Sequence, residues 1–197
     1  NSYQFFGSAQ DHKKVDEGDK GQNTGGMGAY SPSYLLTNKL EEKIKNKIID
    51  PTIKAMKDMN HPFKGFLYAG LMISNGEPYL IEYNIRMGDP ECQVLMMRLE
   101  TDLFEVFECA INNKLNNLKI NWSNKKCIAV VLCAKGYPNK YIKDSEIKNL
   151  SKIVLDKDRQ IFHAGTYENK GKIYSSGGRV LNITSSSEDI RKAREDA

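Results

Sequence analysis

The spacing of apolar residues between Thr37 and Asn60 predicts a helix. Apolar side chains recur there every three or four positions, which places them on one helical face. Asn38 and Glu41 have the spacing of a capping box at its start. Pro51 has no backbone N–H, so we expect it to break or kink the helix. The apolar positions are Leu40, Ile44, Ile48, Ile53 and Met56.

A β-hairpin is predicted after this helix. The segments Lys64–Ser74 and Pro78–Ile85 have strand character, and Asn75-Gly76 lies between them. Asn-Gly favours the two-residue hairpin turn, because both residues tolerate a positive φ. The pattern therefore predicts two neighbouring antiparallel strands.

The rest of the chain alternates helix and strand patterns around a polar interruption. The Asn-rich run over residues 112–124 interrupts the apolar pattern and indicates a domain boundary. Residues 8–33 are rich in glycine and predict an irregular segment, and the sequence Tyr3-Gln-Phe-Phe resembles the middle of a strand. Further helices are expected at 91–99 and at 101–115, the second with Thr101 or Asp102 as its cap. Ser187 can cap a final helix. Further strands are expected at 126–134, 160–165, 172–176 and 179–184. The predicted fold class is α+β, with domains at 1–117 and 118–197.

The composition excludes several classes of protein. Apolar residues make up 40% and charged residues 27% of the 197 positions, as in globular proteins. The lysines are scattered among acids despite a formal charge of +4, so we expect no nucleic-acid partner. No apolar stretch approaches the roughly 20 residues of a membrane span, and the first residues do not show a signal-peptide pattern. Asn1 is not an initiator residue, so we expect a fragment of a longer protein.

The cysteines indicate a reducing compartment. None of the four belongs to a C-x-x-C pair, and each lies in an apolar context, which predicts buried free thiols. We therefore expect a cytoplasmic location. The four are Cys92, Cys109, Cys127 and Cys133.

The strongest candidate chemistry lies at the end of the predicted hairpin. If Tyr79–Asn84 is extended, Glu82 and Asn84 point to one face, because strand side chains alternate. Two such oxygens can be the whole protein contribution to a Mg²⁺ that is also held by substrate phosphates. Arg86 follows two residues later, and its planar fork suits phosphate oxygens. The alternative is an ordinary solvated strand face, which also alternates Glu, Asn and Arg.

Two features favour the phosphate interpretation over the solvated face. Arginine is used only six times beside 23 lysines, so a bidentate role for Arg86 is more plausible than simple solubility. Gly88-Asp89-Pro90-Glu91 then stops the strand and predicts a helix with Asp89 as its N-cap and Pro90 in its first position.

Weaker candidates lie near the start of the chain. Asp11, His12 and Lys13 could contact phosphates or exchange protons, or they could belong to a solvated loop. The glycines at 25, 26 and 28 would let backbone N–H groups approach an anion, although a structural glycine loop is equally consistent. The spacing matches neither a P-loop, a dinucleotide-binding turn nor a calcium loop. No zinc spacing or nucleophile–histidine arrangement is found in the sequence.

Several ordered motifs resemble the phosphoribosylamine–glycine ligase family, also called glycinamide ribonucleotide synthetases. The first four are Ala9-Gln-Asp-His-Lys, Asn23-Thr-Gly-Gly-Met-Gly-Ala-Tyr-Ser-Pro, Gly65-Phe-Leu-Tyr-Ala-Gly-Leu-Met-Ile and Ile81-Glu-Tyr-Asn-Ile-Arg-Met-Gly-Asp-Pro-Glu-Cys-Gln. The later three are Gly136-Tyr-Pro, Phe162-His-Ala-Gly-Thr and Gly177-Gly-Arg-Val-Leu. They cover nearly the whole chain in the family's order.

This resemblance implies a fold and an activity. The family belongs to the ATP-grasp superfamily, so the chain is expected to hold the second half of an ATP-grasp domain, an antiparallel sheet with packed helices. A small sheet-rich C-terminal domain would follow. The implied reaction joins glycine to 5-phosphoribosylamine with ATP, through a glycyl phosphate, to give glycinamide ribonucleotide, ADP and phosphate in purine biosynthesis. The enzyme's task in such a step is positioning and charge neutralisation.

The resemblance also implies roles for individual residues. Glu82 and Asn84 would bind Mg²⁺ or Mn²⁺, Arg86 would steady the transferred phosphoryl or acyl-phosphate oxygens, and Asp89 would act beside it as a second catalytic residue. Substrate or phosphate binding is implied, as a group, for Asp11, His12, Lys13, Gly25, Gly26, Met27 and Gly28.

Two departures from the family pattern limit these expectations. The segment Tyr68-Ala-Gly-Leu-Met offers no additional metal-binding acid. The family's adenine pocket would precede residue 1, so we expect the isolated chain to need the missing N-terminal half and to have no ligase activity alone. Two alternatives stay open: another ATP-grasp enzyme, either a carboxylate–amine ligase or a biotin-carboxylase-like relative, and a non-catalytic module that keeps the fold.

Overall fold

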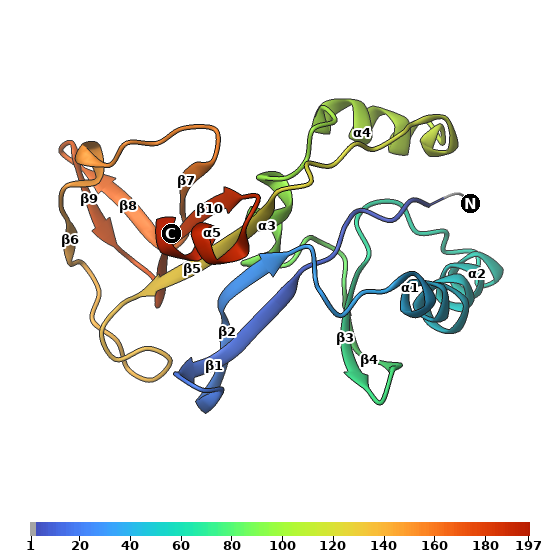
Figure 1. Cartoon of the computed structure of the whole chain (residues 1–197), viewed down its shortest axis with the longest axis horizontal. Helices are drawn as coiled ribbons and strands as arrows, with labels where there is room; N and C mark the ends of the chain where they lie inside the picture. The colour runs from blue at the N-terminus through green and yellow to red at the C-terminus, as the bar shows by residue number, and fades with distance from the viewer. Residues whose placement is uncertain (1–2) are drawn as a thin grey trace. The chain divides into compact units, whose positions relative to one another are not determined.

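The computed structural model describes residues 3–197, which form two compact units that interleave along the chain (Figure 1). Unit 1 contains the stretch ending at Ser8 together with Ser33–Gly88 and Leu99–Trp122. Unit 2 contains Ala9–Pro32, Asp89–Arg98 and Ser123–Ala197. Each unit combines antiparallel strands with helices, so the predicted α+β class is confirmed.

The first helical segment of unit 1 is interrupted, as the proline predicts. Helix α1 (Asn38–Ile44) leads into a π-helical turn (Lys45–Ile49), and α2 (Asp50–Asp58) carries Pro51 in its first turn. A proline is tolerated there because the first-turn N–H groups have no helical partner. The predicted cap is one residue late: Thr37, not Asn38, is the N-cap, and its hydroxyl accepts from the amide of Leu40 at 3.2 Å.

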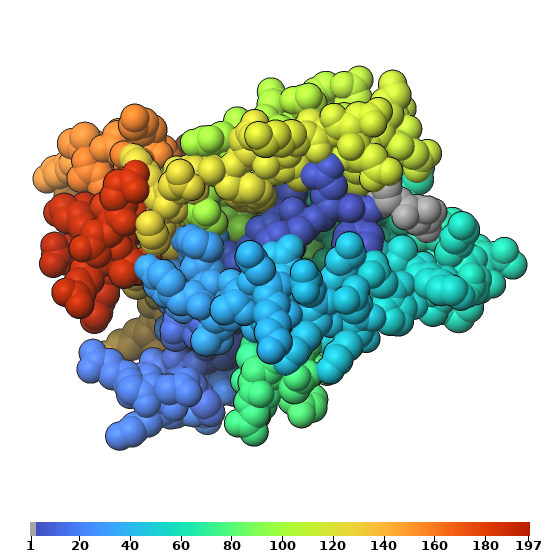
Figure 2. All heavy atoms as spheres, turned by 45° about the vertical axis from the view of Figure 1, so that its right-hand side comes forward, coloured from blue at the N-terminus to red at the C-terminus, as the bar shows by residue number. Residues whose placement is uncertain are grey.

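The predicted hairpin is present in unit 1. Strands β3 (Tyr68–Ser74) and β4 (Glu77–Asn84) pair antiparallel, and φ is +51° at Asn75 and +72° at Gly76. These positive angles are the ones that an Asn-Gly turn supplies without strain. Figure 2 shows the green hairpin reaching the molecular surface.

Unit 1 also contains α4 (Leu103–Ile111) and a short 3-10 turn (Leu115–Asn117). Asp102 caps α4 by accepting from the amide of Phe104 at 2.8 Å, one of the two caps expected. The segment at Tyr3–Phe6 is not a strand, contrary to our expectation. Its aromatic character instead serves packing, since Phe6 makes edge contacts with Phe66 and Trp122.

Unit 2 is organised around a five-stranded antiparallel sheet with the order β1-β2-β5-β10-β7. The glycine-rich stretch expected to be irregular forms two of these strands, so that prediction was wrong. β1 and β2 form a hairpin whose edge pairs with β5, and this pairing supplies the hydrogen bonds that a lone glycine-rich hairpin would lack. The strands are β1 (Gln10–Asp16), β2 (Lys20–Ser31), β5 (Lys126–Cys133), β10 (Arg179–Ser187) and β7 (Arg159–His163).

Two helices pack on this sheet. Val94 of α3 (Glu91–Met96) is fully buried against Ala29, Cys127 and Ala129 of β2 and β5. Helix α5 (Ile190–Asp196) packs on β5 and β10 through the buried Ala193 (Figure 1).

The starts of both helices differ from the predicted caps. α3 is flanked by Pro90, so Asp89 lies one residue outside the cap position, and α5 is capped by Asp189 rather than Ser187. Ser187 instead accepts from the amide of Asp189 at 3.4 Å.

A second, smaller sheet completes unit 2. Its strands have the order β6-β9-β8 and are antiparallel. The strands β6 and β8 were not predicted, whereas β9 was. The elements are β6 (Glu146–Ile147), a 3-10 turn (Leu150–Lys152), β8 (Thr166–Asn169) and β9 (Lys172–Ser175). None of the helices formed by residues 3–197 has the length and apolar character needed to cross a membrane.

Candidate functional site

Glu82 and Asn84 lie on one face of β4 in unit 1. The amide Nδ2 of Asn84 donates to Oε1 of Glu82 at 3.1 Å, which places the two side chains together as strand alternation requires. Glu82 is exposed and Asn84 is half-buried. The pair therefore places an exposed carboxylate next to a half-buried amide at the end of a strand.

The strand opposite Glu82 leaves room for this side chain. Gly70 of β3 pairs with Glu82, and a Cβ at Gly70 would come within 3.1 Å of the Glu82 Cγ. The register shifts beside this pair, between Gly70 and Leu71. Bulges of this kind redirect side chains and are common next to functional sites.

The donor set fits a hard divalent cation. Glu82 and Asn84 supply two oxygens, the number that suffices when substrate phosphates complete the shell. Among residues 3–197 no cluster of three or more histidine, cysteine or acidic side chains could hold a metal by itself. A metal at this pair would therefore need ligands from a bound phosphate compound or water.

Arg86 lies beyond the end of β4. Its Nη1 donates to the carbonyl of Met87 at 2.8 Å, and the side chain is exposed. This bond occupies one nitrogen of the guanidinium and leaves the rest of the fork exposed.

Asp11 and Lys13 form an ion pair on β1 in unit 2. Lys13 Nζ lies 2.5 Å from Asp11 Oδ2, and the Asp11 side chain is only 9% exposed. The other carboxylate oxygen, Oδ1, is buried and has no hydrogen-bond partner within the described residues. His12 points elsewhere: it is exposed, and its ring lies 5.9 Å from that of Tyr30.

The glycines at 25 to 28 lie inside β2, where they form a pronounced bulge. His12 pairs with Gly28 and Lys14 pairs with Asn23, so four residues of β2 lie opposite a single residue of β1, Lys13. We call Thr24–Met27 the β2 bulge.

The amide donors of the β2 bulge are engaged inside unit 2. The N–H of Gly25 donates to the Tyr137 hydroxyl at 3.3 Å, and that of Gly26 donates to Thr24 Oγ1 at 3.0 Å. The amides of Gly25 and Gly26 are therefore already used in holding the bulge and are not free to bind an anion.

Gly26 and Gly28 are required by close packing. A Cβ on Gly26, where φ is +124°, would lie 2.5 Å from Pro90 Cδ and 2.9 Å from Asp11 Oδ1. A Cβ on Gly28 would lie 2.7 Å from the carbonyl oxygen of Ala129 on β5. Met27 Sδ contacts the Cys133 thiol at 3.8 Å.

The carboxylate of Asp89 is held from two sides. Arg179 Nη2 donates to its Oδ2 at 3.0 Å, and Gln93 Nε2 donates to its Oδ1 at 2.9 Å. Arg179 Nη1 also donates to the Asp89 backbone carbonyl at 2.7 Å. The side chain of Asp89 is nevertheless 43% exposed, so it remains accessible to a ligand.

The environment of two cysteines near these residues disfavours the thiolate form. Burial, followed by the charges of Asp89 and Glu91, raises the pKa of the Cys92 thiol. Burial also raises the pKa of Cys133, although Arg179 opposes the effect. Since the thiolate is the reactive form, neither residue is suited to nucleophilic work.

The structure thus separates the predicted residues into two groups. Glu82, Asn84 and Arg86 belong to unit 1, whereas Asp89 and all the N-terminal candidates belong to unit 2. In unit 2, Asp11, Gly26 and Asp89 lie together, while His12 faces Tyr30.

Sequence reasoning missed three residues that hold this group: Gln93, Tyr137 and Arg179. The signal available for Arg179 was the scarcity of arginine, the same argument that had singled out Arg86.

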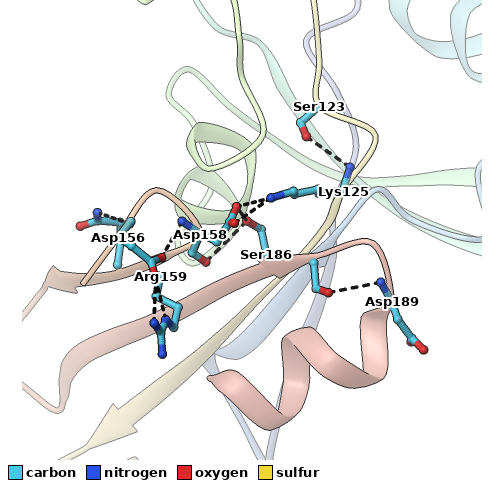
Figure 3. A network of polar contacts seen from close by, with 9 residues as sticks. Ser123, Lys125, Asp156, Asp158, Arg159, Ser186 and Asp189 are labelled. Carbon is cyan, nitrogen blue, oxygen red and sulfur yellow. Dashed lines mark hydrogen bonds and ion pairs between the residues drawn. The ribbon is translucent and has the colours of Figure 1, made fainter. Parts of the chain in front are cut away.

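Unit 2 contains a second polar cluster, drawn in Figure 3. It lines a groove of about 410 Å³. Lys125 Nζ donates to both oxygens of Asp158 at 2.6 and 2.7 Å, and Arg159 pairs with Asp156 at 2.7 Å. Hydrogen bonding to these cations lowers the pKa of each aspartate. Because both cations are neutralised by acids, the cluster supports the sheet edge rather than offering an anion site.

Comparison with known proteins finds two domain models that match successive parts of the chain. Residues 1–92 match the ATP-grasp (A) domain of phosphoribosylglycinamide synthetase, and residues 127–197 match its C domain. The chain is 47% identical over 192 residues to a phosphoribosylamine–glycine ligase of Mesorhizobium japonicum, covering 98% of this chain and 45% of that protein.

Two further proteins with the same name are also similar to the chain. A ligase of the same name from Vigna unguiculata is 48% identical over 94% of this chain and 61% of its own length. The crystal structure of the Thermotoga maritima phosphoribosylamine–glycine ligase superposes with a TM-score of 0.76 at 34% identity, covering 95% of this chain and 46% of that one. The chain therefore spans about half the length of the relatives that it matches.

Proposed function

Because the chain belongs to the phosphoribosylglycinamide synthetase family, we propose that it is part of a phosphoribosylamine–glycine ligase. The enzyme would join glycine to 5-phosphoribosylamine while ATP becomes ADP and phosphate, in purine biosynthesis. The observation that carries this proposal is the ordered match to two successive domains of one synthetase, at residues 1–92 and 127–197.

The proposed reaction has two steps. The glycine carboxylate attacks the γ-phosphorus of ATP, which forms glycyl phosphate and releases ADP. The amine of phosphoribosylamine then attacks the acyl carbon, the acyl–phosphate bond breaks, and phosphate leaves with formation of the amide. Both steps move negative charge between oxygens, so an enzyme accelerates them mainly by positioning and electrostatic stabilisation.

We assign Glu82 and Asn84 to a Mg²⁺ or Mn²⁺ ion that accompanies ATP. Such an ion supplies charge neutralisation at the phosphate oxygens. The support is the shared face of the two side chains and the space left by Gly70. Arg86, with most of its fork exposed, is assigned to the transferred phosphoryl or acyl-phosphate oxygens.

We assign the candidate residues of unit 2 to the part of the active site that binds glycine and phosphoribosylamine. Asp89 is exposed enough to meet a ligand and is fixed by Gln93 and Arg179, which suits a catalytic carboxylate. Asp11, His12 and Lys13 and the β2 bulge would shape this part of the site, as would Gly28. The free cysteines are consistent with a cytoplasmic enzyme.

The test uses an enzyme of the relatives' full length that carries these 197 residues. We expect ADP and phosphate to appear only when glycine and phosphoribosylamine are both present, and mass spectrometry to detect glycinamide ribonucleotide. Phosphate release that needs no glycine, or that needs bicarbonate instead, would overturn the proposal in favour of another ATP-grasp chemistry. Absence of turnover together with absence of Mg²⁺-dependent ADP binding would favour a non-catalytic module.

A further inference from the structure

The β2 bulge is attached to residues that lie more than a hundred positions later in the chain. The N–H of Gly25 donates to the Tyr137 hydroxyl at 3.3 Å, and the carbonyl of Gly25 accepts from Arg179 Nη1 at 3.0 Å. The carbonyl of Gly26 lies 3.5 Å from the same nitrogen. Both backbone groups of Gly25 are therefore fixed by Tyr137 and Arg179.

The same arginine fixes Asp89. Its Nη1 donates to the Asp89 carbonyl at 2.7 Å and its Nη2 to the Asp89 carboxylate at 3.0 Å. The guanidinium carries five N–H donors on three nitrogens, and two of these nitrogens are used here; a lysine ammonium has three donors on one nitrogen and would lose part of the set. Arg179 thus couples the position of the β2 bulge to the orientation of the Asp89 carboxylate.

Three glycines place Arg179 and Tyr137 where they can make these bonds. A Cβ on Gly165 would lie 2.5 Å from the Gly177 Cα and 2.6 Å from the Arg179 carbonyl oxygen. A Cβ on Gly178 would overlap the Tyr137 ring. Larger residues at these positions would force the start of β10 away from its neighbours. The arginine side chain itself is 22% exposed, so most of its fork is shielded from water.

We propose that Arg179 is a positioning residue of the ligase, and that with Tyr137 it holds the β2 bulge and Asp89 in the geometry required by the amine-bearing substrates. The inference rests on the proposed function, because it assigns the arginine to that reaction. Arg179 acts through Asp89 and through the backbone carbonyls and not by contact with the reacting atoms.

The experiment has a structural arm and a kinetic arm, both in the enzyme of the relatives' length. The structural arm measures amide hydrogen exchange by mass spectrometry in Arg179→Gln and Arg179→Lys. We expect exchange in a peptide that spans the β2 bulge to quicken about tenfold or more, with β5 and β10 unchanged, because a local restraint is lost. Arg159→Lys is the matched control, since Arg159 also pairs with an aspartate in unit 2 and lies on β7, which is separated from β2 by β5 and β10 in the sheet.

The kinetic arm separates positioning from simple stability. In both Arg179 variants we expect the KM for glycine or phosphoribosylamine to rise about tenfold or more, while the KM for ATP stays within about twofold. Unchanged exchange in the bulge would overturn the proposal, and so would faster exchange with unaltered kinetics. If the wild-type enzyme has no ligase activity, the proposed function is wrong. The hydrogen-exchange measurement would still show whether Arg179 restrains the β2 bulge.

A second variant covers the case in which loss of Arg179 unfolds unit 2. Tyr137→Phe keeps the ring against Gly178 and removes only the hydroxyl that accepts from Gly25. Faster exchange confined to the bulge in this variant supports the proposal. Exchange equal to that of the wild type in the bulge overturns it.

Discussion

Arg98 donates from Nη1 to the hydroxyl of Ser31 at 2.8 Å, although 67 positions separate the two residues, and both side chains are buried. The other nitrogens of the guanidinium are also used: Nε donates to the Lys125 carbonyl at 2.8 Å and Nη2 to the Ser123 carbonyl at 2.9 Å. One arginine thus satisfies three acceptors at the point where α3, β2 and the entry to β5 meet.

We predict that Arg98→Met destabilises the chain by about 3 kcal/mol or more. Methionine fills much of the space, but it leaves a buried hydroxyl and two carbonyls without this donor, at about 1 kcal/mol or more each. Urea unfolding of the 197-residue chain measures the effect. Arg159→Met is the control; it removes an exposed arginine with a surface ion pair and should change the free energy of unfolding by less than about 1 kcal/mol. Equal effects of the two substitutions would contradict the role given to Arg98.

Glu82→Ala tests the metal assignment in the enzyme of the relatives' length. If Glu82 holds the ion, kcat should fall by at least about a hundredfold, because several kcal/mol of charge stabilisation leave with the ligand. The concentration of Mg²⁺ needed for half-maximal activity should rise as well.

The control for Glu82 is Glu77→Ala, which removes the same atoms from the same strand. Glu77 pairs with Lys43 and Lys47 instead, so kcat should stay within about twofold of the wild type. If kcat falls by less than tenfold in Glu82→Ala, Glu82 is not a metal ligand and belongs to an ordinary solvated strand face.

Gly26→Ala should both destabilise unit 2 and impair turnover. The new Cβ would press on Pro90, on Asp11 Oδ1 and on the Asp89 carbonyl, the last at 3.2 Å. We expect a loss of about 2 kcal/mol or more in the free energy of unfolding, from overpacking added to strain at a positive φ.

Gly18→Ala separates the cost of overpacking from the cost of backbone strain in the Gly26 experiment. Gly18 also has a positive φ, +71°, but a Cβ there meets nothing within 4 Å. Its cost should therefore reflect backbone strain alone, about 1 kcal/mol. If thermal unfolding shows the same loss of stability in both variants, the added Cβ at position 26 does not destabilise unit 2 through close contacts.

The elements that the sequence predicts correctly are those decided by neighbouring residues. The Asn75-Gly76 turn carries the positive φ angles that its dipeptide favours, and Pro51 lies in the first turn of a new helix after the interruption. The β1–β2 hairpin was missed because its partner, β5, lies about a hundred residues later and decides its conformation. A glycine-rich segment without such a partner would have little tendency to form strands.

The same distinction applies to the candidate site. Glu82 and Asn84 are two residues apart, so strand alternation alone predicts that they meet. The contacts of Arg179 span 90 and 154 positions, and no local pattern in the sequence reports them. The predicted boundary after residue 117 and the assigned roles of the site residues remain predictions.

Cys127 should make the chain sensitive to alkali. It is fully buried at the centre of the sheet, between Ser31 of β2 and Ser186 of β10, and burial raises the pKa of its thiol to about 12. In the unfolded chain the pKa is about 8.5. The folded state therefore keeps a proton that the unfolded state releases, so the stabilisation is complete below about pH 8.5 and is lost progressively as the pH rises toward 12.

We expect the free energy of unfolding to fall by up to about 1.4 kcal/mol per pH unit in this window through this residue alone. Cys127→Ala should be less stable at neutral pH, because it leaves a small cavity, yet its stability should decline less between pH 9 and 11 than that of the wild type. Cys109→Ala, at a thiol only partly buried on α4, is the control and should keep the wild-type slope. Urea titrations at a series of pH values give the slopes, and parallel lines for the wild type and Cys127→Ala would show that the folded sheet does not retain this proton.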